Sequence, residues 1–247
     1  MNKMIEFHNI SKIYHNNTII SDLNLSIEKG EFLTVIGSSG CGKTTLLKMI
    51  NGLIKPEYGE VIVDDKNIEN VDLIELRRHI GYCIQGSVLF PHMTVEENIA
   101  YVPRLLNKKK IKQIVNEWMD IVGLNHELLE RYPDELSGGQ QQRVAIARAL
   151  ASSPHILLMD EPFGAVDSIT RSQLQKEIKE IHQKTKVTII FVTHDIQEAL
   201  FLGTKVLVLD KGQIQQYDTP HQIINHPANT FVRNLLDNST KYQDVNC

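Results

Sequence analysis

The sequence predicts an α/β fold built on a mainly parallel sheet, with an antiparallel β subdomain and an inserted helical subdomain. Residues 32–36 (FLTVI) are continuously apolar, as in a strand buried on both faces. In the C-terminal half, strand candidates alternate with helical patterns, which indicates parallel strands joined by crossover helices. Residues from about 90 to 152 have helical periodicity and lack a clear central strand. We therefore expect helices to be inserted between the strands of the sheet.

The individual elements follow in chain order. The first thirty residues alternate apolar and polar side chains, which predicts antiparallel strands. A helix is expected directly after residues 37–44 and another over residues 168–184. Further strands are expected at residues 60–63, 80–84, 156–159, 187–192 and 206–209. We expect one domain over residues 1–237, with the helical subdomain at approximately 87–153, and a polar tail over 238–247.

Composition excludes several classes of protein. The 247 residues are 42% hydrophobic and carry a net charge of −4, which is ordinary for a globular chain and not for a disordered one. The sequence has no excess of basic residues of the kind that indicates nucleic-acid binding. Cys41, Cys83 and Cys247 lie far apart, so we expect reduced thiols in the cytoplasm. No apolar run approaches the roughly 20 residues that a membrane span needs.

A phosphate-binding loop follows the strand at residues 32–36. The run GSSGCGKT at residues 37–44 fits the pattern G-x-x-x-x-G-K-[ST] between a strand and a helix. Its glycines let successive N–H groups point inward, and the helix N-terminus adds positive charge. Lys43 can reach the β- and γ-phosphates of a nucleotide, and the Thr44 hydroxyl can ligate Mg²⁺. The alternative is a glycine-rich turn with an incidental lysine. The candidate nucleotide-binding residues are Gly37, Ser38, Ser39, Gly40, Cys41, Gly42, Lys43, Thr44 and Thr45.

Two carboxylates end the apolar strand at residues 156–159. Asp160 is placed to reach the water shell of Mg²⁺ beside a phosphate loop. Glu161 follows it, where a carboxylate can polarise an attacking water. The alternative is a solvated acidic pair at an ordinary strand end.

A second candidate anion site lies at the start of a helix. The run LSGGQ at residues 136–140 offers exposed N–H groups, a hydroxyl and a helix dipole. One chain does not need two such caps for one nucleotide, whereas a head-to-tail homodimer does. The alternative is a glycine-bearing cap of an ordinary helix. The candidate residues are Ser137, Gly138, Gly139 and Gln140.

Together these motifs resemble those of ABC-transporter ATP-binding subunits, over nearly the whole chain. The resemblance implies a P-loop NTPase core that binds ATP and Mg²⁺ and hydrolyses ATP. It implies that Glu161, His194 (in FVTHD) and Gln85 (in IGYCIQ) are catalytic, that Tyr14 stacks on adenine, and that Asp167 (in GAVD) contributes to the nucleotide site. It assigns the metal to Thr44, Gln85 and Asp160, the last possibly through water. Without the resemblance, Tyr14 reads as a packed strand residue and His194 as a structural one.

The branch of the family is also indicated. Residues 86–98 resemble the segment with which importer ATPases meet a separate membrane permease. The run QQYDTPHQIINHPANTFVRNLL resembles the ATPases of glycine betaine, carnitine and choline uptake. This implies a subunit on the cytoplasmic face of the membrane that powers import of a quaternary-amine osmoprotectant through integral membrane permease subunits, supplied by a substrate-binding protein. The alternatives are an importer of another solute, such as an amino acid, and a soluble ABC ATPase without a transport role. Many members of that group continue into nucleotide-sensing domains. The sequence stops about ten residues after FVRNLL, so the resemblance does not imply regulation of this chain by such domains.

Overall fold

The computed structural model describes residues 2–86, 88–164 and 166–241, so Ser87, Ala165 and residues 242–247 of the predicted tail lie outside the described residues. The chain divides into two compact units. Unit 1 is formed by Met1–Leu73 and Thr188–Cys247, and unit 2 by Ile74–Val187. Unit 1 is therefore assembled from two separate segments of the sequence.

An antiparallel sheet occupies the N-terminal part of unit 1. Its strand order is β2-β1-β4-β5. The alternating apolar residues Ile5, Phe7 and Ile10 are fully buried, so the antiparallel strands predicted for the first thirty residues are present. The bounds are β1 (Lys3–Tyr14), β2 (Asn17–Glu28), β4 (Tyr58–Val63) and β5 (Lys66–Asn67), followed by a 3₁₀ turn, η1 (Ile68–Asn70).

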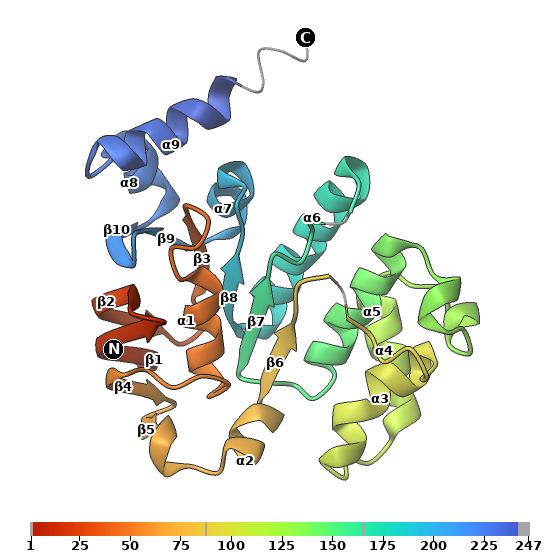
Figure 1. Ribbon diagram of the computed structural model, residues 1–247. Helices are drawn as coiled ribbons and strands as arrows, with labels where there is room; N and C mark the ends of the chain where they lie inside the picture. The colour runs from red at the N-terminus through yellow and green to blue at the C-terminus, as the bar shows by residue number, and fades with distance from the viewer. Residues whose placement is uncertain (1, 87, 165, 242–247) are drawn as a thin grey trace. The chain divides into compact units, whose positions relative to one another are not determined.

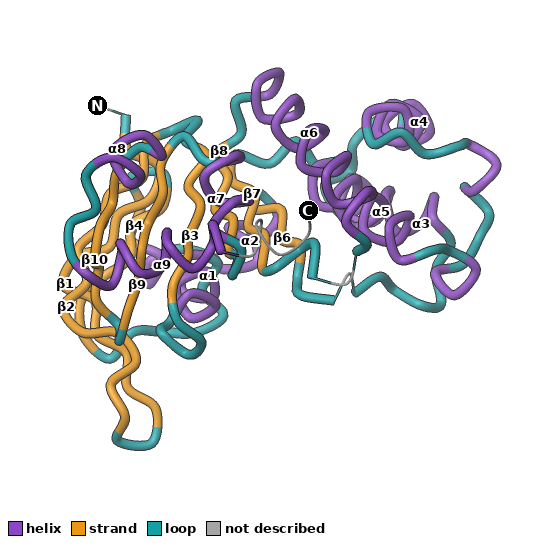
Figure 2. Tube along the Cα trace, turned by 90° about the horizontal axis from the view of Figure 1, so that it is seen from above, coloured by secondary structure: helices purple, strands orange, loops and turns teal. Residues whose placement is uncertain are grey.

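A tight turn joins β1 to β2. His15 and Asn16 have φ values of 45° and 67°, as in the hairpin turns whose twist matches that of the flanking strands. In Figure 2 this turn lies at the bottom of the view, at the far end of the β1–β2 hairpin.

A parallel layer completes unit 1. The apolar strand β3 (Phe32–Gly37) pairs in parallel with β8 (Thr188–Val192) on one side and β9 (Lys205–Asp210) on the other. An unpredicted strand, β10 (Gln213–Asp218), pairs antiparallel to β9. Figure 1 shows β3 beside β8 and β9. The helices of unit 1 are α1 (Lys43–Ile50), α7 (Ile196–Leu202), α8 (Pro220–Asn225) and α9 (Thr230–Lys241).

Unit 2 combines a short parallel pair with helices. The strands β6 (Ile80–Cys83) and β7 (Ile156–Asp160) pair in parallel from Ile80–Ile156 to Cys83–Met159. The helix predicted over residues 168–184 is present as α6 (Ser168–Thr185). The other helical elements are α2 (Leu73–Arg78), α3 (Val95–Leu105), α4 (Ile111–Ile121), η2 (His126–Leu128), η3 (Pro133–Glu135) and α5 (Gly138–Leu150).

The fold is thus α/β with parallel strands, as predicted. In the part of the chain that the structure describes, no helix combines the length and the apolar character required to cross a bilayer.

Candidate functional site

The phosphate loop of unit 1 begins at the carboxyl end of β3. Gly37 has a φ of 153°, and a Cβ atom there would lie 1.9 Å from the carbonyl oxygen of Leu209 on β9. Gly42 has a φ of 105° and would bring a Cβ within 2.9 Å of the Ile20 side chain. These two positions require glycine because the backbone passes too close to its neighbours for any side chain.

Lys43 lies within the curve of this loop. Its Nζ donates hydrogen bonds to the carbonyl oxygens of Gly37 at 3.0 Å and Ser38 at 2.9 Å. The residue is 9% exposed, and α1 starts at Lys43 with no side-chain hydrogen bond at its N-cap, Gly42. A buried ammonium beside the uncapped N-terminus of a helix is an arrangement suited to an anion.

Two neighbours fix the loop further. The Ser38 hydroxyl donates to Oδ1 of Asp210 at 2.7 Å, which joins the loop to the end of β9. Cys41 is 3% exposed, and burial raises the pKa of its thiol, against the opposing effect of Lys43. Cys41 therefore stays protonated at neutral pH, which fits a role for its backbone rather than for its sulfur.

Tyr14 and His194 belong to the same unit as the loop. Tyr14 ends β1 and is 39% exposed. His194 is exposed and follows β8, the parallel neighbour of β3. Parallel strands end at one edge of a sheet, so the phosphate loop and His194 share an edge. Asp195 then caps α7 by accepting from the N–H groups of Gln197 and Glu198.

A second cluster lies in unit 2, where β6 and β7 end side by side. The Gln85 side-chain amide donates to Oε2 of Glu161 at 3.2 Å. Asp160, the last residue of β7, is only 3% exposed, whereas Glu161 is half-buried with a φ of 44°. Burial and the nearby Asp160 carboxylate raise the pKa of Tyr82 to about 12, so this phenol is neutral at physiological pH. The structure therefore brings Gln85, Asp160 and Glu161 together.

The LSGGQ run forms the start of α5. Ser137 is the N-cap, and its hydroxyl oxygen accepts from the Gln140 N–H at 3.3 Å, while the Gln140 side chain accepts from the Ser137 N–H at 2.9 Å. This reciprocal capping box occupies the Gln140 N–H group, which the sequence analysis had counted among the possible anion donors. The Ser137 O–H remains a donor, since a hydroxyl that accepts one hydrogen bond can still donate another.

Asp167 caps the neighbouring helix. Its Oδ1 accepts from the N–H groups of Ile169 at 3.1 Å and Thr170 at 3.0 Å. These hydrogen bonds, chiefly that from Thr170, hold the pKa of Asp167 below its usual value. A pocket of about 440 Å³ is lined by both helix starts, namely by Ser137, Gly138, Gly139, Gln140, Arg143, Val166, Asp167, Thr170 and Gln173.

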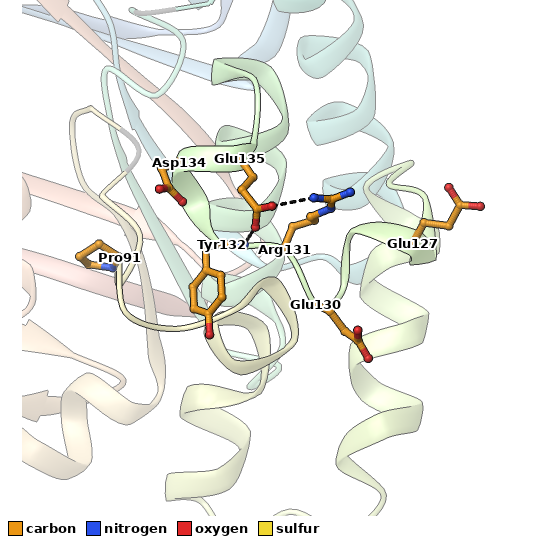
Figure 3. Close-up of a pocket in the computed structure, with 7 residues that line it drawn as sticks. All are labelled: Pro91, Glu127, Glu130, Arg131, Tyr132, Asp134 and Glu135. Carbon is orange, nitrogen blue, oxygen red and sulfur yellow. Dashed lines mark hydrogen bonds and ion pairs between the residues drawn. The ribbon is translucent and has the colours of Figure 1, made fainter.

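An acidic pocket of about 760 Å³ lies elsewhere in unit 2 (Figure 3). We call it the acidic pocket, and its lining is Pro91, Glu127, Glu130, Arg131, Tyr132, Asp134 and Glu135. Arg131 pairs with Glu135 at 2.6 Å, and the same carboxylate accepts from the Tyr132 N–H at 2.7 Å. Four acidic side chains against one arginine leave the lining strongly negative.

Three residues near these sites belong to no motif: Asp210, Tyr82 and Thr170. Asp210 follows the apolar run 206–209, so its position at a strand end was available as a signal. Thr170 excludes a side chain at Gly139 of the LSGGQ run, because a Cβ on Gly139 would lie 2.7 Å from the Thr170 Cγ2 atom. No local pattern marks Thr170, because it matters through its closeness to Gly139 on the neighbouring helix. Tyr82 is linked to the site by the charge of Asp160.

Comparison with known proteins identifies the family. The ABC transporter family model matches residues 20–164, more than half of the chain. The carnitine transport ATP-binding protein OpuCA of Listeria monocytogenes is 48% identical over 236 residues, covering 94% of this chain and 59% of that protein. The glycine betaine uptake system ATP-binding protein YehX of Escherichia coli is 47% identical over 238 residues, covering 96% of this chain and 77% of that protein.

Solved structures give the same result. The dimeric structure of a bacterial ABC transporter cassette has a TM-score of 0.79 and 34% identity, covering 88% of this chain and 99% of that one. The chain spans about three fifths of the length of curated relatives such as the Listeria protein. The matched family model, these identities and the phosphate loop lead to one conclusion: the chain belongs to the ABC transporter family and has the fold of its ATPase cassettes.

Proposed function

We propose that the chain is the ATP-hydrolysing subunit of an importer for a small solute, a quaternary-amine osmoprotectant in the first instance. The observation that carries the ATPase part is the phosphate loop. Its lysine is 9% exposed and lies inside the loop, at a helix N-terminus without a side-chain cap. The ATP triphosphate is the ligand that the motif and this charge arrangement suit.

The residues of unit 1 bind the nucleotide. Lys43 leaves the carbonyls of Gly37 and Ser38 to contact the β- and γ-phosphates, and the loop N–H groups hold the remaining oxygens. His194 donates a hydrogen bond to the γ-phosphate from the same sheet edge, where charge accumulates during transfer. Tyr14 offers its exposed ring to the adenine.

The residues of unit 2 act on the water. The Glu161 carboxylate orients the attacking water and takes its proton, and Gln85, 3.2 Å away, holds that carboxylate and the water in place. The phosphoryl group passes to the water oxygen, the bond to the β-phosphate oxygen breaks, and ADP and phosphate leave.

A divalent cation fits the same residues. Among the described residues, no three His, Cys, Asp or Glu side chains form a metal site by themselves. Mg²⁺ is commonly held by one or two carboxylates together with substrate phosphates. The family resemblance assigns this ion to Thr44, Gln85 and Asp160, the last directly or through water. Mg²⁺ held there with ATP would neutralise negative charge on the triphosphate.

The LSGGQ run at residues 136–140, here called the signature, acts on the partner's nucleotide in a head-to-tail homodimer. The pocket at Ser137 and Asp167 combines two helix starts, a free hydroxyl donor and glycine backbone. It contains no phosphate loop of its own, and the similar cassettes of known structure form dimers. Each signature then closes the phosphate site of the other subunit.

The hydrolysis proposal is tested with Glu161→Gln. The amide is nearly isosteric, so ATP affinity is kept while single-turnover hydrolysis falls by about 10²–10⁴, the usual contribution of a positioned base. Because the bound ATP is not cleaved, the variant accumulates as a dimer. Light scattering in the presence of Mg·ATP measures the mass of this dimer. Glu180→Gln, the same change on the exposed face of α6, is the matched control and keeps normal turnover. Near-normal hydrolysis by Glu161→Gln would transfer the role of base to His194.

The permease contact uses the segment 86–98 and the acidic pocket beside it. Pro91 belongs to both, and the negative lining suits a basic helix end of a permease on the cytoplasmic face of the membrane. We expect Glu127→Lys with Glu130→Lys to abolish co-purification with a co-expressed permease and to leave ATP turnover of the isolated chain unchanged. Glu117→Lys with Glu180→Lys, which reverses two exposed glutamates outside the pocket, is the charge-matched control. Undiminished co-purification by the double variant would remove the pocket from the interface.

The cargo is proposed from the relatives. Those of Bacillus subtilis include a glycine betaine/carnitine/choline transport ATP-binding protein, 48% identical over 236 residues. A polyamine is the second candidate, because a spermidine/putrescine import ATP-binding protein of Clostridium acetobutylicum is 46% identical over 235 residues. Uptake of labelled betaine and of labelled spermidine by a deletion strain, with its partner permease and substrate-binding protein intact, separates the two.

A further inference from the structure

A buried ammonium group lies against the ring of Tyr14. Lys12 and Tyr14 are two positions apart on β1 and therefore point to the same face of the sheet. The Lys12 Nζ lies 4.9 Å from the centroid of the Tyr14 ring. Lys12 is 8% exposed, whereas Tyr14 is 39% exposed. One face of the ring thus receives the cation while a large part of the side chain remains open to solvent.

This ammonium group is held from two sides. It donates to the backbone oxygen of Lys55 and to Oε1 of Glu57, each at 2.7 Å. The second carboxylate oxygen of Glu57 accepts from the Ile13 N–H at 2.7 Å. Glu57 therefore joins the side chain of Lys12 to the backbone between Lys12 and Tyr14.

The ion pair persists at neutral pH. The hydrogen bond from Lys12, followed by that from the Ile13 N–H, keeps the pKa of Glu57 below its usual value. A lysine ammonium is buried at a cost unless it is paired, so the carboxylate and carbonyl fix its position. The cation in turn fixes the ring by a cation–π contact.

We propose that Lys12 is a positioning residue that holds the Tyr14 ring for stacking with the base of ATP. The inference rests on the proposed role of Tyr14 in nucleotide binding. An aromatic side chain near a hairpin turn loses rotamer freedom when a base stacks on it, and a ring that is already held loses less. The cation also draws π density toward one face of the ring, which reduces repulsion between the opposite face and the electron-rich adenine.

The chemistry separates this role from the phosphate loop. Lys12 acts on the base alone, since the triphosphate is bound by Lys43 and the loop N–H groups. Loss of Lys12 therefore weakens a ligand that carries a base and leaves a ligand without a base unaffected. A general loss of structure in unit 1 weakens both ligands together.

Titration calorimetry of the full chain with Mg·ATP and with inorganic tripolyphosphate tests the proposal. Lys12→Met keeps the aliphatic stem and removes the charge, and we expect about two- to fivefold weaker ATP binding with unchanged tripolyphosphate binding. Lys12→Arg keeps a cation that can lie on the ring and retains most of the ATP affinity. Lys55→Met is the matched control, because the Lys55 backbone oxygen, and not its exposed side chain, contacts Lys12.

Tyr14→Ala completes the set, with a loss of ATP affinity at least as large as that of Lys12→Met. If Tyr14→Ala weakens ATP and Lys12→Met does not, the positioning role is refuted while base stacking stands. If neither changes ATP affinity and tripolyphosphate still binds, stacking on Tyr14 fails together with the inference, and the phosphate loop stands. Equal weakening of both ligands reduces Lys12 to a structural role. Lys12→Gln, which also removes the cation over the Tyr14 ring but keeps a hydrogen-bond donor, replaces Lys12→Met if that variant does not fold, and the same outcomes apply.

Discussion

Asn98 organises the segment that follows Gln85, and its removal gives a measurable local effect. The residue is fully buried on α3. Its amide nitrogen donates to the backbone oxygens of Phe90, Met93 and Thr94 at 3.2, 3.1 and 3.0 Å. Its oxygen accepts from the Phe90 N–H at 2.9 Å and from Arg148 at 3.3 Å. One side chain therefore holds both the start and the end of the turn that leads into α3.

The loss of stability caused by Asn98→Ala depends on which backbone groups keep a second hydrogen-bond partner. The Phe90 oxygen still accepts from the Met93 N–H, and the Thr94 oxygen from the Asn98 N–H. The Phe90 N–H and the Met93 oxygen lose the bond to Asn98. A buried polar group deprived of its partner costs about 1–3 kcal/mol. Because Phe90 and Met93 are half-buried, we expect about 2–4 kcal/mol for the two groups together.

Native-state hydrogen exchange measures this effect locally. We expect the amides of residues 88–98 to exchange faster by the factor that corresponds to about 2–4 kcal/mol, whereas amides of β3 and β8 in unit 1 are unchanged. Asn116→Ala on the exposed surface of α4 is the matched control and leaves exchange in this segment unaltered. A loss below about 0.5 kcal/mol for Asn98→Ala, within the range of ordinary surface substitutions, would refute the reasoning.

Three further predictions concern the loop, the signature and a buried thiol. Lys43→Ala weakens ATP binding and abolishes hydrolysis, because the phosphates lose the loop's ammonium group; normal turnover would contradict the P-loop assignment. Gly139→Ala places a Cβ 2.7 Å from the Thr170 methyl group and lowers ATP-dependent dimerisation in light scattering, while Thr170→Ser removes that methyl and restores dimerisation; no rescue would refute the steric explanation. Burial raises the pKa of Cys83 to about 12. The folded state therefore keeps a proton that the unfolded thiol loses near pH ~8.5, so this group makes unfolding more favourable as pH rises above that value. Alkylation of Cys83, followed by mass spectrometry, is slow in the folded chain even near pH ~10 and fast in urea; equally fast alkylation in both states would show that the thiol is accessible.

The parts predictable from sequence were those with a local signal. Continuous apolar character predicted β3, and period-two alternation predicted β1 and β2. In contrast, β10 (QIQQYD) was not predicted, because its half-buried polar residues lack a strand pattern and its pairing with β9 depends on a neighbouring strand. Helix α3 continues through Pro103, a residue that usually argues against a helix interior.

The candidate site shows the same limit. The glycine pattern identified the phosphate loop, but the Cβ contact that excludes other residues at Gly37 comes from β9, far along the chain. The residue types predicted the chemistry of Glu161, yet its bond to Gln85 depends on the parallel pairing of β6 with β7. Such contacts depend on tertiary packing, which local patterns in a single sequence do not reveal. The grouping of Ser137, Asp167 and the other proposed site residues around a nucleotide stays a prediction.

The position of β3 between β8 and β9 affects how the protein folds during its synthesis on the ribosome. The strand that carries the phosphate loop is synthesised early, while its partners β8 and β9 begin about 156 and 173 residues later. At about 5–20 residues per second, the apolar segment FLTVI waits on the order of ten seconds before its partners emerge. During that interval the nascent chain presents an unpaired strand with four apolar residues out of five, which is the kind of segment that chaperones at the ribosome cover and that aggregates when translation stalls. Slow codons or pauses within this interval would therefore lower the yield of folded protein without changing a single residue.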